Sequence, residues 1–253
     1  MPDHSPALAF ECVTKRFGAT TAVDAVSLDI AGGSFVALVG TSGSGKSTLL
    51  KTINRLIAPS DGRVAIDGTD VATGPAPDLR RRIGYVFQNI GLFPHMTIAE
   101  NIAIGLRIAG RAQDARIDDL LDLVDLPRAI AGRLPDALSG GQRQRVGIAR
   151  ALAPGAKLLL LDEAFGALDP VTRDALGTRI RDLHDRLGLT TILVTHDMAE
   201  ALLLADRVLV MKAGRIVADA TPADLVAGKG GDDAQALVQV PRAQADRLRA
   251  LVA

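Results

Sequence analysis

The chain has 253 residues, of which 48% are hydrophobic and 23% charged, which suits one large α/β domain or one domain with an insertion. Its 29 basic and 29 acidic residues cancel. Since proteins that hold nucleic acid by its backbone usually carry a basic excess, we expect no nucleic-acid partner. No apolar run approaches the roughly 18 residues that cross a bilayer, and the first residues lack a signal-peptide pattern, so we expect a soluble, cytoplasmic chain.

The N-terminal part of the chain is expected to form strands. Alternating apolar residues predict half-exposed antiparallel strands over 8–17 and 25–30. The sole cysteine, Cys12, lies in the first of them and is expected to be a small buried side chain. A continuous apolar run over 34–40 predicts a strand buried on both faces. Further patterns predict a helix over 46–57, with Leu49, Leu50, Ile53, Leu56 and Ile57 on its apolar stripe, and strands over 62–68 and 82–88.

The second half alternates between helices and buried strands. A helical insertion is expected over about 89–153, with helices over 97–109, 115–124 and 140–153. Buried strands over 157–163 and 190–196 flank an amphipathic helix over 169–187, on which Leu176, Ile180, Leu183 and Leu187 are aligned. The fold class is therefore α/β: a mainly parallel sheet flanked by helices, with an N-terminal antiparallel β subdomain and a helical insertion. We expect one domain over 8–227 and a short tail over 228–253, consisting of a Gly/Asp linker and a short helix.

The segment GTSGSGKST follows a buried strand and opens a helix, which is the context of a phosphate-binding loop. Its glycines let the backbone wrap around phosphates, Lys46 can reach the β- and γ-phosphates, and the Ser47 hydroxyl can ligate Mg²⁺. An ordinary glycine-rich turn is the disfavoured alternative. The predicted loop comprises Gly40, Thr41, Ser42, Gly43, Ser44, Gly45, Lys46, Ser47 and Thr48.

Polar residues end three of the later predicted strands, at the sheet edge where α/β proteins bind ligands. Asp162 can hold Mg²⁺ through water, and the adjacent Glu163 can orient or deprotonate an attacking water. His196 can hydrogen-bond a γ-phosphate, and Gln88 can reach Mg²⁺ or the water. The alternatives are solvated acids that cap a strand and a structural histidine.

Phe17 lies in the segment KRFG ahead of the predicted core. An aromatic ring in a loop near a nucleotide can stack on adenine. Without the neighbouring motifs, a packed core position would be the favoured interpretation of Phe17 over stacking on adenine.

The segment LSGGQRQRV, residues 138–146, is a second anion-binding pattern far from the first. Ser139 and the amides of Gly140 and Gly141 are expected at the N-terminus of a helix, where unsatisfied N–H groups and the helix dipole attract an anion.

In this order the motifs resemble those of the ATP-binding subunit of an ABC transporter, over about Phe10 to Val226. LSGGQ ahead of LLLLDE separates this family from GTPases, kinases and helicases. The departures are mild: Thr41 and Ala164 stand where many members have proline. By this resemblance, Phe17 matches the adenine-stacking aromatic, Gln88 the Q-loop glutamine, Ser139, Gly140, Gly141 and Gln142 the signature, Glu163 the catalytic base, Asp169 the D-loop aspartate and His196 the switch histidine.

The resemblance implies ATP and Mg²⁺ as cofactors and a head-to-tail homodimer, in which each signature loop caps the nucleotide of the partner subunit. A loop that does not reach its own nucleotide then has a purpose. ATP holds the dimer together and its hydrolysis releases it. The resemblance also implies permease subunits as partners, a solute-binding protein as an indirect partner, and a place at the cytoplasmic face of the membrane.

The cargo is open to several interpretations. Residues 49–62, 85–102, 169–176 and 194–217 resemble the branch that imports quaternary amines such as glycine betaine and choline. Amino acids, sulfate or polyamines are the alternative cargoes. A soluble ABC ATPase that acts on ribosomes or DNA is an alternative from another class. We expect no long C-terminal regulatory domain, because the chain ends at Ala253.

Overall fold

The computed structural model describes residues 7–87, 90–110, 117–166 and 168–251. Two units can be recognised in it. Unit 1 contains the residues up to Thr73 and those from Ile192 onward, and unit 2 contains Gly74–Thr191. Unit 1 is therefore built from both ends of the chain, whereas unit 2 is one continuous segment.

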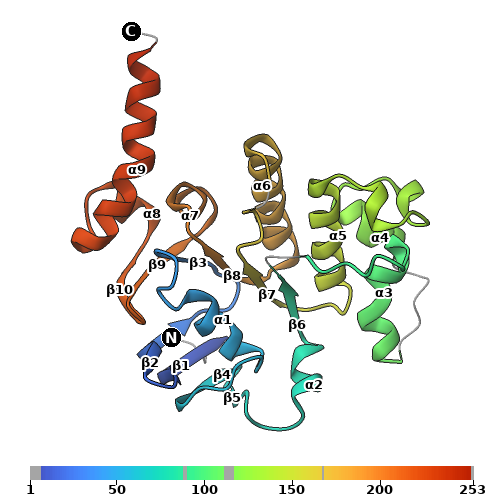
Figure 1. The fold of residues 1–253 in the computed structure, drawn as a ribbon, viewed down its shortest axis with the longest axis horizontal. Helices are drawn as coiled ribbons and strands as arrows, with labels where there is room; N and C mark the ends of the chain where they lie inside the picture. Colours follow the sequence, from blue (N-terminus) through green and yellow to red (C-terminus); the bar gives the residue numbers. More distant parts are fainter. Residues whose placement is uncertain (1–6, 88–89, 111–116, 167, 252–253) are drawn as a thin grey trace. The chain divides into compact units, whose positions relative to one another are not determined.

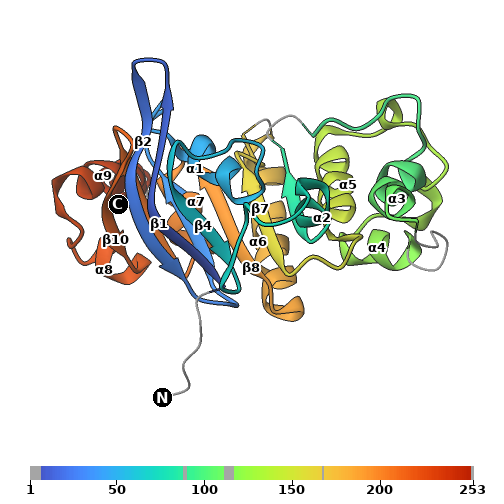
Figure 2. The same ribbon diagram turned by 90° about the horizontal axis from the view of Figure 1, so that it is seen from below.

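Unit 1 holds an antiparallel sheet in the order β2-β1-β4-β5 and a second group of strands in the order β10-β9-β3-β8. Figure 2 shows β1 and β2 as one long hairpin. All five residues of β3 are buried, as expected for the run FVALV, and β3 pairs in parallel with β9. The elements are β1 (Leu8–Phe17), β2 (Thr20–Ile30), β3 (Phe35–Val39), α1 (Lys46–Ile53), β4 (Asp61–Ile66), β5 (Thr69–Asp70), β8 (Thr190–Thr195, whose first two residues belong to unit 2), α7 (Met198–Leu204), β9 (Arg207–Lys212), β10 (Arg215–Ala220), α8 (Pro222–Val226) and α9 (Gly231–Ala250).

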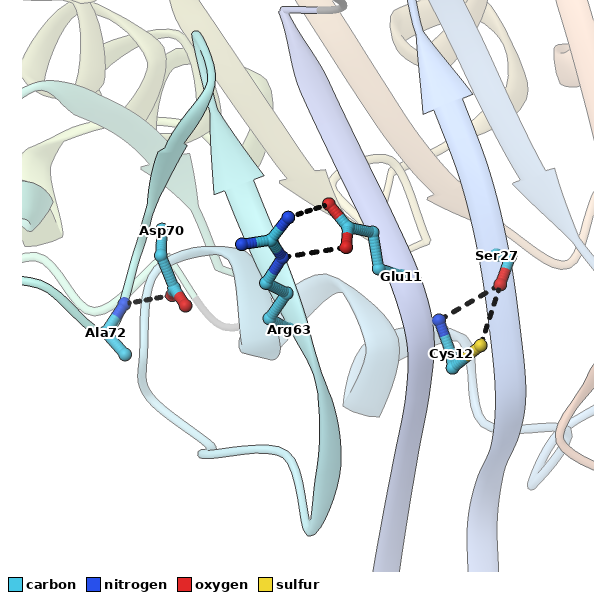
Figure 3. Close-up of polar contacts among 6 residues, drawn as sticks. All are labelled: Glu11, Cys12, Ser27, Arg63, Asp70 and Ala72. Atoms are coloured by element: carbon cyan, nitrogen blue, oxygen red, sulfur yellow. Dashed lines mark hydrogen bonds and ion pairs between the residues drawn. The ribbon is translucent and has the colours of Figure 1, made fainter.

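Cys12 is exposed, so its predicted burial is wrong. The register of β1 against β2 shifts between Phe10 and Val13, and Cys12 has a φ of 49°. A bulge of this kind adds one residue and breaks the alternation of faces, so Glu11 and Cys12 both point outward while Val13 is fully buried. The N–H of Cys12 donates to Ser27 Oγ at 3.0 Å, as Figure 3 shows.

Helix α1 ends at Ile53, four residues earlier than predicted. Asn54 leaves the helical conformation, its Oδ1 accepts the N–H of Leu56 at 3.1 Å, and Arg55 has a left-handed φ of 55°. A polar residue that hydrogen-bonds its own backbone competes with the helix in this way. Leu56 is consequently 43% exposed and does not belong to the buried stripe of Leu49, Leu50 and Ile53.

Unit 2 combines a parallel pair of strands with helices. β6 and β7 run parallel, with Tyr85 opposite Leu160. Between these two strands the described residues form helices and loops only (Figure 1). The elements are α2 (Ala76–Arg80), β6 (Ile83–Val86), α3 (Ile98–Ile108), α4 (Ile117–Leu123), the 3-10 helices η1 (Arg128–Ile130) and η2 (Pro135–Ala137), α5 (Gly140–Leu152), β7 (Leu158–Asp162) and α6 (Pro170–Leu187).

The helices of unit 2 start and pack as their patterns predict. Thr97 caps α3 with Glu100 in a reciprocal capping box. On α6, Leu176, Ile180 and Leu183 are buried. The predicted fold class is confirmed: an antiparallel β subdomain, an α/β core and a helical insertion are all present. The predicted limits of the insertion, residues 89 to 153, remain a prediction.

The predicted short final helix is instead the 20-residue helix α9. The Gly/Asp stretch expected to be a linker contributes its first turn, because Asp232 and Asp233 are favourable near a helix N-terminus. Ala234 and Val238 are buried where α9 packs on α7, α8 and β10 (Figure 1). In the part of the chain that the structure describes, no helix combines the length and the apolar character needed to cross a membrane.

Candidate functional site

The predicted phosphate loop of unit 1 connects the buried strand β3 to α1. A Cβ atom at Gly40 would lie 2.1 Å from the carbonyl oxygen of Met211, and one at Gly45 would lie 2.1 Å from the carbonyl oxygen of Ala22. Gly45 also has a φ of 105°. Both positions therefore require glycine, because the loop passes directly against the backbones of β2 and β9.

Lys46 lies inside this loop and is only 4% exposed. Its Nζ donates to the carbonyl oxygen of Gly40 at 2.8 Å, to that of Thr41 at 2.9 Å and to Ser44 Oγ at 3.4 Å. Thr41, Ser42 and Gly43 are exposed. The loop thus places an ammonium group beneath an exposed stretch of backbone, an arrangement that suits an anionic ligand.

Two other predicted residues of unit 1 are exposed, as ligand contact requires. Phe17 ends β1 and is 50% exposed, with Lys15 Nζ 5.0 Å from its ring centroid. The alternative of a packed core residue is wrong for Phe17. His196 follows β8 directly, and Asp197 after it caps α7 by accepting the N–H of Ala199 at 2.8 Å.

In unit 2, Asp162 ends β7 and is 4% exposed. Its Oδ2 accepts a hydrogen bond from Tyr85 Oη at 2.7 Å. Burial, followed by the nearby Asp162 carboxylate, raises the pKa of Tyr85 above its ordinary value. Glu163 follows with a φ of 49°, a left-handed conformation that costs free energy in a residue with a side chain and is frequent at functional sites.

The signature segment begins helix α5, as predicted. Ser139 is the N-cap: its Oγ accepts the N–H of Gln142 at 3.3 Å, and its own N–H donates to Gln142 Oε1 at 2.9 Å. This is a complete capping box. Gly140 and Gly141 form the first turn.

Asp169 is brought close to the signature through Thr172. Asp169 caps α6 by accepting the N–H of Thr172 at 3.0 Å. Hydrogen bonds from the side chain and then from the backbone of Thr172 hold the pKa of Asp169 below its ordinary value. A Cβ atom on Gly141 would lie 2.5 Å from the methyl carbon of Thr172. The starts of α5 and α6 are therefore in direct contact within unit 2.

Two functional candidates were missed by sequence reasoning. Tyr85 holds Asp162, and its position on a strand that pairs in register with β7 is the only signal for it. Arg150 of α5 donates to the carbonyl oxygens of Gly91 at 2.9 Å and of Ile90, so it ties the segment that follows Gln88 to the signature helix. Burial lowers the pKa of Arg150. Gln88 itself lies outside the described residues.

Two of the three predicted magnesium ligands, Ser47 and Asp162, are among the described residues, and the third, Gln88, is not. Among the described residues, no group of three or more His, Cys, Asp or Glu side chains could hold a metal. Mg²⁺ at nucleotide sites typically uses one or two protein oxygens together with phosphates and water. Each of the two units supplies one oxygen donor of this kind: the Ser47 hydroxyl at the start of α1 in unit 1, and in unit 2 the buried Asp162 carboxylate, which accepts the hydrogen bond of Tyr85.

Comparisons with known proteins identify the family to which the chain belongs. A family model described as "ABC transporter" matches residues 23–166. The glycine betaine/carnitine/choline transport ATP-binding protein OpuCA of Bacillus subtilis is 48% identical over 223 residues, which cover 87% of this chain and 59% of that protein. The chain thus spans less than two thirds of the length of that relative.

Other relatives carry different names. The glycine betaine uptake system ATP-binding protein YehX of Escherichia coli is 47% identical over 228 residues, which cover 89% of this chain and 74% of that protein. The sulfate/thiosulfate import ATP-binding protein CysA of Caulobacter vibrioides is 50% identical over 222 residues, which cover 85% of this chain and 65% of that protein.

Solved structures share the fold. CbiO1 of Clostridium perfringens, part of the ABC transporter complex CbiONQ, superimposes with a TM-score of 0.81 at 29% identity, covering 88% of this chain and 91% of that one. The dimeric post-hydrolysis structure of the ATP-binding cassette MJ0796 with ADP and Pi has a TM-score of 0.75 at 33% identity, covering 85% of this chain and 98% of that one.

Proposed function

Because this chain belongs to the ABC transporter family, we propose that it is the ATP-hydrolysing subunit of a membrane importer. The observation that supports this most is the phosphate loop, where Lys46 is buried beneath exposed backbone and two glycines are enforced by neighbouring carbonyl groups. The cassette is proposed to occupy residues 8–227, with residues 228–253 as a C-terminal extension.

Each site residue has a proposed role. The loop residues Gly40 to Thr48 bind the phosphates of ATP, and the Phe17 ring stacks on adenine. Mg²⁺, which neutralises charge on the phosphates, is held by Ser47, Gln88 and Asp162. Glu163 orients or deprotonates the attacking water, and His196 hydrogen-bonds the γ-phosphate. The signature residues Ser139, Gly140, Gly141 and Gln142, together with Asp169, contact the nucleotide of the partner subunit.

The proposed working form is a head-to-tail homodimer with ATP at its interface. The dimeric MJ0796 cassette supports this form. We expect Glu163→Gln to bind ATP, to hydrolyse it slowly and to accumulate as a dimer, because ATP that is not hydrolysed keeps the interface closed. Light scattering at saturating ATP measures the mass, and Lys46→Ala, which lacks the phosphate contact, should remain monomeric beside it. A monomeric Glu163→Gln protein would contradict the dimer.

In this proposal the chain is a peripheral subunit at the cytoplasmic face of the membrane, attached to permease subunits and served indirectly by a solute-binding protein. Co-purification of a tagged chain with its permease from membranes tests the attachment. Recovery of the chain with ribosomes or DNA instead would favour the soluble class of ABC ATPases.

The proposed cargo is a quaternary amine osmoprotectant such as glycine betaine or choline. The similarity to OpuCA and YehX supports it. The equally high identity to CysA makes sulfate or thiosulfate the second candidate.

Uptake of labelled glycine betaine, choline and sulfate separates the two candidates. Cells that lack other importers would carry the permease and solute-binding partners together with either the intact chain or Lys46→Ala. Betaine or choline uptake that requires Lys46 would support the first cargo, and sulfate uptake that requires Lys46 would replace it by the second.

A further inference from the structure

The only tyrosine of the chain contacts the carboxylate at the end of β7. Tyr85 Oη donates to Asp162 Oδ2 at 2.7 Å, within unit 2. Tyr85 lies opposite Leu160, so Asp162 is two residues further along β7, on the same face as Leu160. The long side chain of Tyr85 reaches this diagonal neighbour, as the hydrogen bond shows.

Several features keep this contact in place. A hydrogen bond from a hydroxyl to a carboxylate is charge-assisted and stronger than a neutral one. The Tyr85 ring packs against Phe87, with ring centroids 4.4 Å apart and an angle of 57° between the planes. Tyr85 therefore donates to Asp162 from a ring that packs against its neighbour Phe87.

We propose that Tyr85 is a positioning residue for magnesium, which fixes the plane of the Asp162 carboxylate on which the ion of Mg·ATP would bind. This inference rests on the proposed ATPase function. A ligand that is oriented before the ion arrives loses less freedom on binding, and partners of metal ligands commonly govern metal affinity for this reason.

The first test is Tyr85→Phe, which removes the hydroxyl and keeps the ring against Phe87. We expect the Mg²⁺ concentration for half-maximal ATP turnover to rise about tenfold, while ATP binding without Mg²⁺ stays unchanged. A displacement titration with Mn²⁺ and a non-hydrolysable ATP analogue, followed by paramagnetic resonance, should show the same loss of metal affinity without any turnover.

The matched control is Thr191→Val. It removes another buried hydroxyl of unit 2, which hydrogen-bonds His184 Nδ1 at 2.9 Å. A general loss of stability would appear in both variants, whereas the change in metal affinity should appear in Tyr85→Phe alone. A magnesium response of Tyr85→Phe equal to wild type, or an equal shift in Thr191→Val, would overturn the inference.

The chain itself supplies a spectroscopic test, because it contains one tyrosine and no tryptophan. Tyrosine emission is quenched when the phenol is hydrogen-bonded to a carboxylate. In nucleotide-free, metal-free protein we expect Asp162→Asn to emit more strongly than wild type, and equal emission would contradict the contact.

If wild type and Lys46→Ala hydrolyse ATP alike, the proposed function fails. If only the Tyr85→Phe comparisons show no difference, that function stands and the role of Tyr85 fails.

Discussion

Helices α1 and α5 both start in glycine-rich segments, and the two starts are built differently. Helix α5 starts behind Ser139, which shares a complete capping box with Gln142. Helix α1 starts behind Gly45, which has no side chain with which to cap it, and the buried Lys46 lies within the loop. The backbone N–H groups at the start of α5 are thus partly paired by its own side chains, whereas the start of α1 is shaped by backbone contacts and a buried cation.

This difference bears on how each helix start can bind an anion. The carbonyl groups of Ala22 and Met211 enforce the shape of the α1 loop, so this shape exists before any ligand arrives, as the proposed binding of phosphate requires. The α5 start is a stable helix end without a ligand. An anion that binds at the start of α5 must compete with the hydrogen bonds between Ser139 and Gln142. We therefore expect changes at α1 to abolish nucleotide binding, and changes at α5 to lower hydrolysis while nucleotide binding is kept.

The largest effect is expected for Lys46→Ala. Loss of the ammonium group removes charge stabilisation at the phosphates, and ATP turnover should fall by a factor of about 100 or more. Phosphate release measures the loss of turnover, and binding of a fluorescent nucleotide measures the loss of affinity. Lys51→Ala, on the last turn of the same helix, is the matched control and should turn over normally. Full turnover by Lys46→Ala would end the assignment of the phosphate loop.

At the other helix start, Ser139→Arg should bind ATP with unchanged affinity and yet hydrolyse it at background rate. The bulky cation would crowd the γ-phosphate that the partner subunit presents. Ser139→Ala separates this effect from the lost cap, which should cost about 1 kcal/mol of unfolding free energy. Loss of nucleotide binding in Ser139→Arg would place the signature at the nucleotide of its own subunit.

A smaller effect, on the free energy of unfolding, distinguishes Gly141 at the start of α5 from Gly45 at the start of α1. Gly141→Ala brings a Cβ to 2.5 Å from the Thr172 methyl carbon, and we expect a loss of about 1–3 kcal/mol in unfolding free energy. Adding Thr172→Ser removes that methyl group and should restore most of the loss. Gly45→Ala meets the backbone oxygen of Ala22, which no side-chain substitution can remove. Denaturant unfolding of the variants measures this, and a double variant as unstable as Gly141→Ala would exclude the steric explanation.

The smallest effect concerns pH at the α6 cap. Because the pKa of Asp169 is lowered in the folded chain, its contribution to stability is present above the unfolded pKa and disappears as the pH falls through the folded value. Asp169→Asn keeps a capping oxygen, so its Tm should match wild type at neutral pH and fall less than wild type between about pH 5 and pH 3. Asp174→Asn on the same helix is the control. Parallel pH profiles for Asp169→Asn and wild type would contradict this role of the carboxylate.

Periodicity and motif context predicted much of this molecule, and the errors have local causes. The run FVALV and the glycines around Lys46 predicted β3 and its loop, because backbone clashes leave few alternatives there. Cys12 was placed on the wrong face because one bulge residue reverses the alternation. The end of α1 was missed because Asn54 competes for the backbone. Tyr85 was overlooked because its partner is 77 positions away and is known only from strand register.

The discontinuity of unit 1 has a consequence for the order in which the chain matures on the ribosome. Strand β3, which leads into the phosphate loop, has β8 and β9 as its neighbours, and both are synthesised long after it. Unit 2 is continuous and can fold while synthesis proceeds. A nascent chain therefore carries β3 with both edges unpaired until Thr195 has emerged, and with one edge unpaired until Lys212 has emerged. We therefore expect the proposed nucleotide site to form late in synthesis, and to be missing in chains that end before β9.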